Sequence, residues 1–392
     1  MADDEIVIGV VATLVGPLAG MGEDALRGVE LAINEFGGQV AGKYIVLLTE
    51  SSSAIPDVAV HAAERLLDKE RVDFVIGPLS GNEGLAMREF AKTRPDKVFI
   101  NGISAAQDTT LRDPAPNFYT FSPDGVQWIA GLGRYAYEVL GCRRVVTLAE
   151  DYSYPHAQVG SFVLEFCRAG GDIIDRQWVA LGTRDYSAVI ESVPADADAV
   201  FVALVGTDSL NFLQQYLEAG RPFPLIGGTN TLDQFILKSI DVPLEQLVGI
   251  TCGAPIADDN PHPAWQQFYN AYRNSFHDGL NGPSHLAYGY YNNTKAALLA
   301  LAQVDGDVSG DQSRFKQALA ALEFDCPTGP VRLDHNRCAI ATNFVTEVTL
   351  ADDGMLYHRL MAEIPEVNQT LGMPEDEFLR IGRFNRDVPA CG

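Results

Sequence analysis

Short apolar runs alternate with amphipathic stretches over the first third of the chain. The run at residues 6–11 is continuous, which is typical of a strand buried on both faces of a sheet. Apolar side chains then recur at helical spacing over residues 25–36. The pattern continues with strands predicted at 44–48, 74–76 and 98–100 and helices at 56–67 and 83–92. This alternation predicts a parallel sheet with helices on both faces.

The same alternation begins a second time in the middle of the chain. The second set of predicted strands is 145–149, 173–179, 200–205, 225–228 and 248–251. Two successive sets of strands favour two doubly wound lobes over one large sheet. The pattern then changes to helices at 263–276, 283–301 and 312–322 and a closing hairpin with strands 331–333 and 339–349. No low-complexity linker separates the sets, so we expect ordered crossing segments and a hinge-like closure.

Composition and charge argue against several classes of protein. A chain of 392 residues with 47% hydrophobic composition can bury a large core. The formal net charge of −24 is spread along the chain, which argues against binding to nucleic acid or anionic lipid. No apolar run approaches the roughly 18 residues of a membrane span, so we expect no membrane insertion. Residues 1–5 lack a basic and apolar leader, and we infer that an export signal has been trimmed from this sequence.

The six cysteines, at 142, 167, 252, 326, 338 and 391, include no CxxC pair and accompany no cluster of histidines. We therefore expect neither a metal site nor a cofactor. Cys326 and Cys338 flank a predicted turn at 334–337 and could pair in an oxidising compartment. Buried free thiols are the alternative.

Five motifs follow one another along the chain, and several lie where a predicted strand ends. They are 8–10 with 14–22 (Ile-Gly-Val, Leu-Val-Gly-Pro-Leu-Ala-Gly-Met-Gly), 76–81 (Ile-Gly-Pro-Leu-Ser-Gly), 151–154 (Asp-Tyr-Ser-Tyr), 225–229 (Leu-Ile-Gly-Gly-Thr) and 328–334 (Thr-Gly-Pro-Val-Arg-Leu-Asp). In this order they resemble the leucine/isoleucine/valine-binding family of ABC-importer receptors over nearly the whole chain. Any one of them alone is a weak signal.

The resemblance implies the type I periplasmic binding protein fold, an α/β fold of two Rossmann-like doubly wound lobes joined by three crossing segments. We expect the crossings near Phe121, Gly253 and Val331. The N-terminal lobe then comprises residues 1–121 and 254–330, and the C-terminal lobe residues 122–253 and 331–392.

Two loops of the first lobe follow the third and fourth predicted strands. Ligands of open α/β sheets bind beyond the carboxyl ends of the strands, where helix N-termini present amide groups. By the resemblance, these loops hold the carboxylate of the ligand; alternatively, Ser80 and Ser104 only cap the helices that follow. Met21 lies where some relatives carry a bulky aromatic residue, and it offers an adaptable apolar surface. The residues of the two loops are Ser80, Gly81, Asn82, Ile103, Ser104 and Ala105.

In the second lobe, Tyr154 matches a tyrosine of the family that covers the ligand. Tyrosine suits a cleft that opens and closes, because it has an apolar face and one hydroxyl. The other contacts that we expect from this lobe are Tyr152, Val205, Thr207, Thr229 and Asn230.

Thr229 departs from the family pattern, because amino-acid-binding relatives place an acidic residue there to pair with the ligand's ammonium group. An unpaired buried ammonium costs several kcal/mol, so a zwitterionic amino acid is disfavoured unless Asp208 or Asp233 substitutes. Residues 117–128 and 131–133 resemble the branch of the family associated with aromatic acids, although their aromatic side chains also suit a core.

We therefore expect a periplasmic, monomeric solute receptor that binds a small carboxylate, in the first place an aromatic acid, in the cleft between its lobes. Its protein partner is the permease of an ABC importer. A receptor for branched-chain or other amino acids is the alternative. An α/β enzyme is disfavoured because no GxSxG elbow, P-loop or GxGxxG follows a strand, so no catalytic residue is expected. A ligand-sensing module is disfavoured because no DNA-binding or membrane segment accompanies the lobes.

Overall fold

The computed structural model of the chain describes residues 4–16 and 18–391. Pro17 of the first motif lies outside the described residues, as do Met1, Ala2 and Asp3 of the leader segment. The chain forms two compact α/β units, each built from two separate stretches of sequence. The first unit comprises Met1–Asp124 and His262–Ala341, and the second comprises Gly125–Pro261 and Thr342–Gly392.

Each crossing between the units lies C-terminal to the position expected from the sequence. The third differs most, because Val331 belongs to β13 (Gly329–Leu333), which pairs with β12 (Glu323–Cys326) inside the first unit. The crossing strand is β14 (Ala339–Leu350), which pairs with β13 at its start and with β11 (Thr251–Ala254) farther on.

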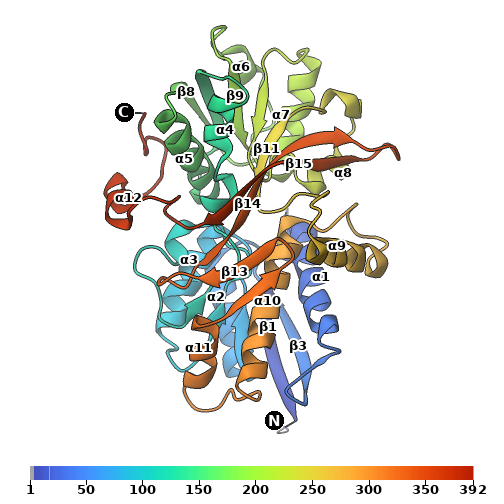
Figure 1. Cartoon of the computed structure of the whole chain (residues 1–392), viewed down its shortest axis with the longest axis vertical. Helices are drawn as coiled ribbons and strands as arrows, with labels where there is room; N and C mark the ends of the chain where they lie inside the picture. The colour runs from blue at the N-terminus through green and yellow to red at the C-terminus, as the bar shows by residue number, and fades with distance from the viewer. Residues whose placement is uncertain (1–3, 17, 392) are drawn as a thin grey trace. The chain divides into compact units, whose positions relative to one another are not determined.

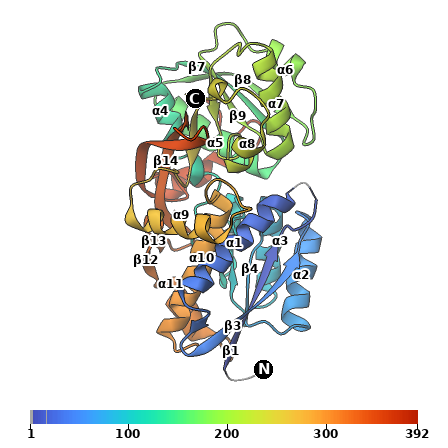
Figure 2. The same cartoon turned by 90° about the vertical axis from the view of Figure 1, so that its right-hand side faces the viewer.

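Five parallel strands form the sheet of the first unit, in the order β3-β1-β4-β5-β6, and β2 pairs antiparallel with β3 at one edge. Helices α2 and α3 lie on one side of the sheet, and α1 and α10 on the other (Figure 2). The elements are β1 (Glu5–Ala12), α1 (Ala19–Glu35), β2 (Gln39–Val40), β3 (Lys43–Ser51), α2 (Pro56–Asp68), β4 (Phe74–Ile76), α3 (Gly81–Lys92), β5 (Phe99–Ile100), β6 (Phe118–Tyr119), α9 (Pro263–Ser275), α10 (His285–Gln303) and α11 (Ser313–Ala320).

The second unit repeats this strand order as β8-β7-β9-β10-β11, again parallel. Strand β14 pairs antiparallel with β11, and β15 pairs with β14 (Figure 1). The remaining elements are α4 (Leu132–Glu138), β7 (Arg144–Glu150), α5 (Ser153–Arg168), β8 (Asp172–Val179), α6 (Ser187–Glu191), β9 (Ala199–Ala203), α7 (Gly206–Glu218), β10 (Leu225–Gly227), α8 (Gln234–Ser239), β15 (Leu356–Val367) and α12 (Glu375–Ile381).

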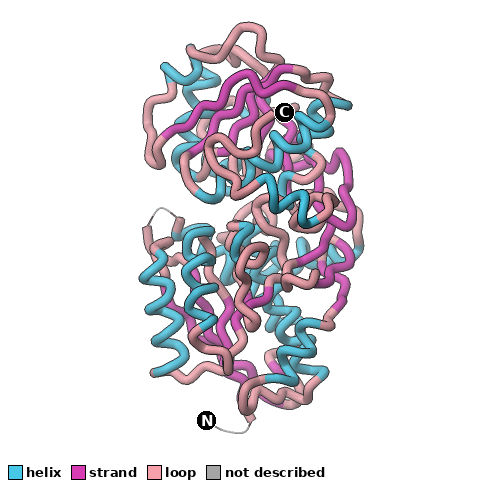
Figure 3. Tube along the Cα trace, turned by 90° about the vertical axis from the view of Figure 1, so that its left-hand side faces the viewer, coloured by secondary structure: helices cyan, strands magenta, loops and turns pink. Residues whose placement is uncertain are grey.

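Alternate residues of the central strands of the second unit point to opposite faces of the sheet. Val146 packs in one apolar cluster with Phe212 of α7. Val145 packs in another with Phe201 and Phe162, and the rings of the two phenylalanines stack at 4.4 Å. Both faces of the sheet are therefore covered by helices (Figure 3), which is why these strands have continuous apolar sequences.

Two expectations about the later strands were wrong in detail. The strand predicted at 248–251 begins only at Thr251, because the chain turns at Gly249, where φ is +90°. The predicted hairpin also does not end the ordered structure, since β15 and α12 follow it. Strand β15 pairs only with β14, and partly buried and exposed side chains alternate along much of it, so it lacks a continuous apolar run.

The late helices complete the first unit through a buried carboxylate. Asp24 of α1 is fully buried and accepts hydrogen bonds from the hydroxyl of Tyr272 in α9 and from the hydroxyl of Ser284, at 2.5 Å. Arg27 donates to it from the next turn of α1, at 3.3 Å. Ser284 is also the N-cap of α10. No helix of the described chain, α10 included, is long and apolar enough to cross a membrane.

Cys326 and Cys338 are buried free thiols and do not form the disulfide that their spacing allowed. Cys326 ends β12, Cys338 precedes β14, and β13 lies between these two strands in the sheet. Two strand spacings amount to roughly 9.5 Å. This exceeds the limit of about 7 Å between the Cα atoms of a disulfide.

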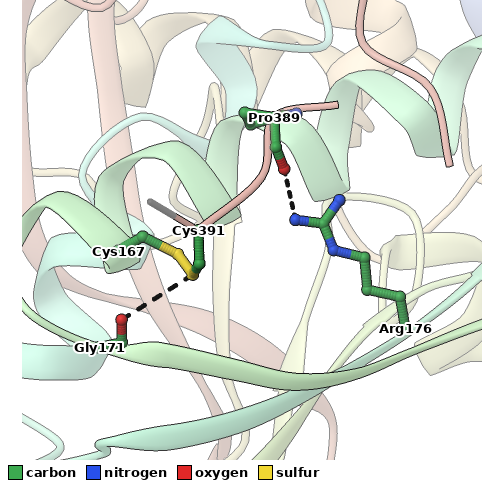
Figure 4. Close-up of a disulfide and its surroundings, with 5 residues drawn as sticks. All are labelled: Cys167, Gly171, Arg176, Pro389 and Cys391. Carbon is green, nitrogen blue, oxygen red and sulfur yellow. Dashed lines mark hydrogen bonds between the residues drawn. A yellow bond between two sulfur atoms is a disulfide. The ribbon is translucent and has the colours of Figure 1, made fainter. Parts of the chain in front are cut away.

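A disulfide that the sequence pattern did not indicate joins Cys167 of α5 to Cys391, over a separation of 224 residues. Arg176 donates a hydrogen bond to the carbonyl of Pro389, next to this bridge (Figure 4). Farther along α5, Phe384 packs on Gly160, where a Cβ atom would lie 2.3 Å from the ring. The C-terminal segment, residues 383–391, is thus attached to α5.

Replacing Asp24 by alanine is expected to lower the free energy of unfolding by about 3 kcal/mol, because two buried hydroxyls and the partly buried Arg27 lose their acceptor. Glu30→Ala is the matched control, since Glu30 is exposed on the same helix, and its effect should stay below about 0.5 kcal/mol. Urea denaturation followed by circular dichroism measures both variants. Equal stability of the two would contradict the role of Asp24.

Cys391→Ala is expected to lower the free energy of unfolding by roughly 3 kcal/mol, because a cross-link over a long loop restricts the unfolded chain. Thermal melts with and without dithiothreitol provide the measurement. The reductant should lower the Tm of the wild type to that of the variant and leave the variant unchanged. A wild-type Tm that does not respond to the reductant would refute this contribution.

Candidate ligand-binding site

In each unit the first parallel strand lies between the second and the third: β1 lies between β3 and β4, and β7 between β8 and β9. The helices that follow β1 and β4 lie on opposite faces of their sheet, as do those that follow β7 and β9, which creates a topological switch point in each unit. Ligands of open α/β sheets bind in the crevice outside the carboxyl ends of the strands at such a point. Met21 and Ser80 follow β1 and β4, whereas Tyr154 and Val205 follow β7 and β9. The fold therefore puts these candidates at the sheet edge where ligand sites occur.

Ser80 is the N-cap of α3 and forms a capping box with Glu83. Its hydroxyl accepts from the amide of Glu83 at 3.4 Å, and its own amide donates to the carboxylate of Glu83 at 2.9 Å. The structure therefore confirms that Ser80 caps α3. The capping box uses two backbone amides at this helix end but leaves the hydroxyl hydrogen of Ser80 able to donate.

The two loops of the first unit lie together. The hydroxyl of Ser104 is 3.5 Å from the carbonyl of Gly81, and it lies so close to α3 that a Cβ at Gly84 would be 1.9 Å from it. The amide of Ser104 donates to Asn101, and that of Ile103 donates to Pro78, both at 3.1 Å. Ser104 does not cap a helix, because Ala106 precedes the short 3₁₀ turn that follows.

The remaining first-unit candidates differ in exposure. Asn82 is exposed at the start of α3, whereas Ala105 is 4% exposed. Met21 lies in the first turns of α1 with 6% of its surface exposed. The next residue, Gly22, meets the end of β1 so closely that a Cβ there would lie 1.7 Å from the carbonyl oxygen of Thr13. This contact fixes the start of α1 beside the carboxyl end of its strand.

In the second unit, Tyr154 and Asn230 are joined directly, since the amide of Asn230 donates to the hydroxyl of Tyr154 at 3.1 Å. Tyr154 is 4% exposed, and its ring lies 6.1 Å from that of Trp128 and 6.2 Å from that of Tyr152. Burial raises the pKa of the Tyr154 hydroxyl well above its usual value, so this group is neutral. The Oδ1 atom of Asn230 is buried and has no hydrogen-bond partner among the described residues.

Thr229 is 5% exposed and carries no charge into the site. Its hydroxyl donates to the carbonyl of Gly253 at 3.0 Å, and its amide donates to Gln158 of α5 at 2.9 Å. Asp233 is the N-cap of α8, where its Oδ1 accepts from the amides of Phe235 and Ile236. One carboxylate oxygen of Asp233 is thus committed to the helix.

Glu150 was not among the predicted site residues, although it ends β7 at the switch point. Its Oε1 accepts from the amide of Val205, the N-cap of α7, at 3.2 Å. Burial, with the nearby charge of Asp208, raises the pKa of Glu150 to about 8. Thr207 is exposed on the first turn of α7. No sequence signal singles out Glu150, because a charged residue at the end of an apolar run resembles a solvated strand end.

The loop that carries the two tyrosines is held by a charged contact to the C-terminal segment. Asp151 binds Nε2 of His156 at 2.9 Å and forms an ion pair with Arg386. Arg386 and His156 together lower the pKa of Asp151. Tyr152 is partly exposed, and burial of its hydroxyl, followed by the charge of Glu150, raises its pKa.

Other predicted features lie in the core or hold no ion. Phe118, Tyr119, Phe121 and Trp128 are each at most 2% exposed, so they are core residues of their units. Among the described residues, no group of three or more His, Cys, Asp or Glu side chains is arranged to hold a metal ion.

Known proteins share this fold over most of their length. The sequence profile of the family described as Periplasmic binding protein matches residues 5–354. The Leu/Ile/Val-binding protein homolog 6 of Brucella melitensis biotype 1 is 22% identical over 365 residues, which cover 91% of this chain and 90% of the relative.

Two solved structures are also similar. An ABC transporter substrate-binding protein from Sphaerobacter thermophilus is 31% identical, with a TM-score of 0.86 and coverage of 93% of this chain and 99% of that one. A solute-binding protein of an ABC transporter from Rhodopseudomonas palustris BisB5, in complex with 3,4-dihydroxybenzoic acid, is 23% identical, with a TM-score of 0.83 and coverage of 94% and 99%. The chain therefore belongs to the periplasmic binding protein family, whose members are substrate-binding receptors of ABC transporters and not enzymes.

Proposed function

We propose that the chain is the periplasmic solute receptor of an ABC importer and delivers a small carboxylate, preferably an aromatic acid, to the membrane permease. It works as a monomer, without a metal or cofactor. Residues of both units contact the ligand, and binding shifts the receptor toward the state that the permease recognises. The contact residues are Met21, Ser80, Gly81, Asn82, Ile103, Ser104, Ala105, Tyr152, Tyr154, Val205, Thr207, Thr229 and Asn230.

The observation that carries the preference for an acid without an amine is the absence of an acidic side chain at position 229, which is occupied by Thr229. Its hydroxyl and amide donate to groups of the protein, so the position supplies no counter-ion for an ammonium. Burial raises the pKa values of both Glu150 and Asp208, which disfavours their charged forms. Binding an ammonium group here would require the buried carboxyl of Glu150, whose pKa is about 8, to ionise, which costs free energy.

The carboxylate of the ligand is held in the first unit by hydroxyls and main-chain amides. The amides of Ser80, Ile103 and Ser104 already donate within the chain. We assign the anchoring role to the Ser80 hydroxyl and to the amides of Gly81 and Ala105. Gly81 is the first residue of α3, and the first amides of a helix attract anions.

The relatives support both the proposed class and its alternative. The similar solute-binding protein from Rhodopseudomonas palustris BisB5 holds 3,4-dihydroxybenzoic acid, which supports an aromatic acid. The name of the Brucella relatives, Leu/Ile/Val-binding protein homologs, favours a branched-chain amino acid instead. The two classes differ in the ammonium group, for which this chain lacks the acidic residue at Thr229.

Isothermal titration calorimetry with benzoate, 4-hydroxybenzoate and L-leucine tests the proposed function. We expect micromolar binding of the aromatic acids, equivalent to about −8 kcal/mol, and at least about tenfold weaker binding of leucine because its ammonium stays unpaired. Binding of leucine without binding of either aromatic acid would establish the alternative.

Tyr154→Ala is expected to weaken binding of the aromatic acid by about tenfold or more, because the ring and the anchor of Asn230 are both lost. Tyr44→Ala is the control, since Tyr44 is 61% exposed on β3, and it should bind like the wild type. Titration calorimetry gives the affinities, and circular dichroism verifies that both variants fold. An unchanged affinity of the Tyr154 variant would remove this residue from the site.

A further inference from the structure

Strands β7 and β9 flank the switch point of the second unit. Strand β7 ends in an acidic residue, Glu150, whereas β9 ends in Ala203. Glu150 is 0% exposed. Burial removes the water molecules that would otherwise hydrate its carboxyl group, which costs free energy. Such a group is stable only when both of its oxygens find hydrogen-bond partners.

The hydroxyl of Tyr152 and the carboxyl of Asp208 interact with Glu150, but only one of its oxygens has a well-formed hydrogen bond within the described residues. Oε1 accepts the amide of Val205, a proposed ligand contact. Oε2 is buried without a hydrogen-bond partner among the described residues. If the only role of this side chain were to accept the hydrogen bond of the Val205 amide, a neutral side chain would be sufficient. The second oxygen therefore points to a group that is absent from the protein itself.

The surroundings of Glu150 favour a neutral partner for this oxygen. The titratable groups around it are Asp208 of α7 and the hydroxyls of Tyr152, Tyr154 and Tyr186. None of them is a cation. A raised pKa of about 8 keeps the carboxyl largely protonated in neutral solution, and a protonated carboxyl both donates and accepts hydrogen bonds. A hydroxyl group on the ligand fits this environment, because it too can donate and accept.

We propose that Glu150 recognises a ring hydroxyl of the ligand through Oε2, so that the receptor selects hydroxylated aromatic acids over unsubstituted ones. This inference rests on the proposed function and specifies the substrate class of the same site. The ring hydroxyl binds to Glu150 of the second unit. Asn230, whose Oδ1 is also buried without a partner, supplies an acceptor for a second hydroxyl on the ring.

The decisive measurement is the ratio of two dissociation constants, that of benzoate divided by that of 4-hydroxybenzoate. We expect the wild type to favour 4-hydroxybenzoate by about tenfold, the value of one buried hydrogen bond to a carboxyl group. Glu150→Leu removes the hydrogen bond and keeps the volume, so it should bring the ratio to about one by weakening 4-hydroxybenzoate alone. Glu150→Gln retains hydrogen-bonding atoms in the same shape and should keep most of the preference.

Two further variants complete the design. Glu191→Leu is the matched control, since Glu191 is exposed on α6 of the same unit, and its ratio should equal that of the wild type. Glu150→Ala deletes the carboxyl without adding apolar bulk and replaces Glu150→Leu if that variant does not fold. Circular dichroism of each variant verifies the fold.

The outcomes separate this inference from the proposed function. A wild type that binds benzoate and 4-hydroxybenzoate equally, or a Glu150→Leu variant that keeps the preference, overturns the inference and leaves the proposed function standing. Equal weakening of both ligands by Glu150→Leu makes Glu150 a structural residue and also overturns the inference. If the wild type binds no aromatic acid, the proposed function fails and this inference fails with it. Leucine binding that depends on Glu150 would identify the residue as an ammonium partner instead.

Discussion

A strand that is buried on both faces of a sheet is mostly apolar along its length, so most of its polar side chains lie at its ends. This constraint governs both units, because their central strands are covered by helices on the two sides. Hydroxyls, amides and carboxyls therefore collect at the carboxyl edge of each sheet, where the connections after β1 and β4, and those after β7 and β9, leave toward opposite faces. The same burial that stabilises the sheets thus concentrates the chemistry of the receptor in a few loops.

Much of the fold followed from this constraint and was predictable from the sequence. Continuous apolar runs identified β1, β4 and β7, because only strands covered on both faces need such runs. Strand β6, which has two residues, and strand β15, which lies at an edge and alternates in burial, lack such a run and were not predicted. The bridge between Cys167 and Cys391 was not predictable, since a pairing over 224 residues leaves no local pattern.

The loops of the candidate site were predictable from the sequence. Which of their hydrogen-bond donors and acceptors remain able to bind a ligand was not. A serine followed by a glutamate three residues later predicts the capping box of Ser80. The acceptors of the Ile103 and Ser104 amides, in contrast, come from the packing of two loops against each other. Glu150 was overlooked because a charged residue after a strand resembles an ordinary solvated end. Only its complete burial distinguishes it.

The discontinuity of the units affects how the chain is made. On the ribosome, α1 is synthesised early, but the hydroxyls that satisfy Asp24 belong to Tyr272 and Ser284. Domains generally fold as units while synthesis proceeds from the N-terminus. Here one face of the first sheet stays only partly covered until α10, which ends at Gln303, has emerged with about three quarters of the chain. A nascent chain in this state is a natural client for chaperones and remains open to export machinery that accepts only unfolded proteins.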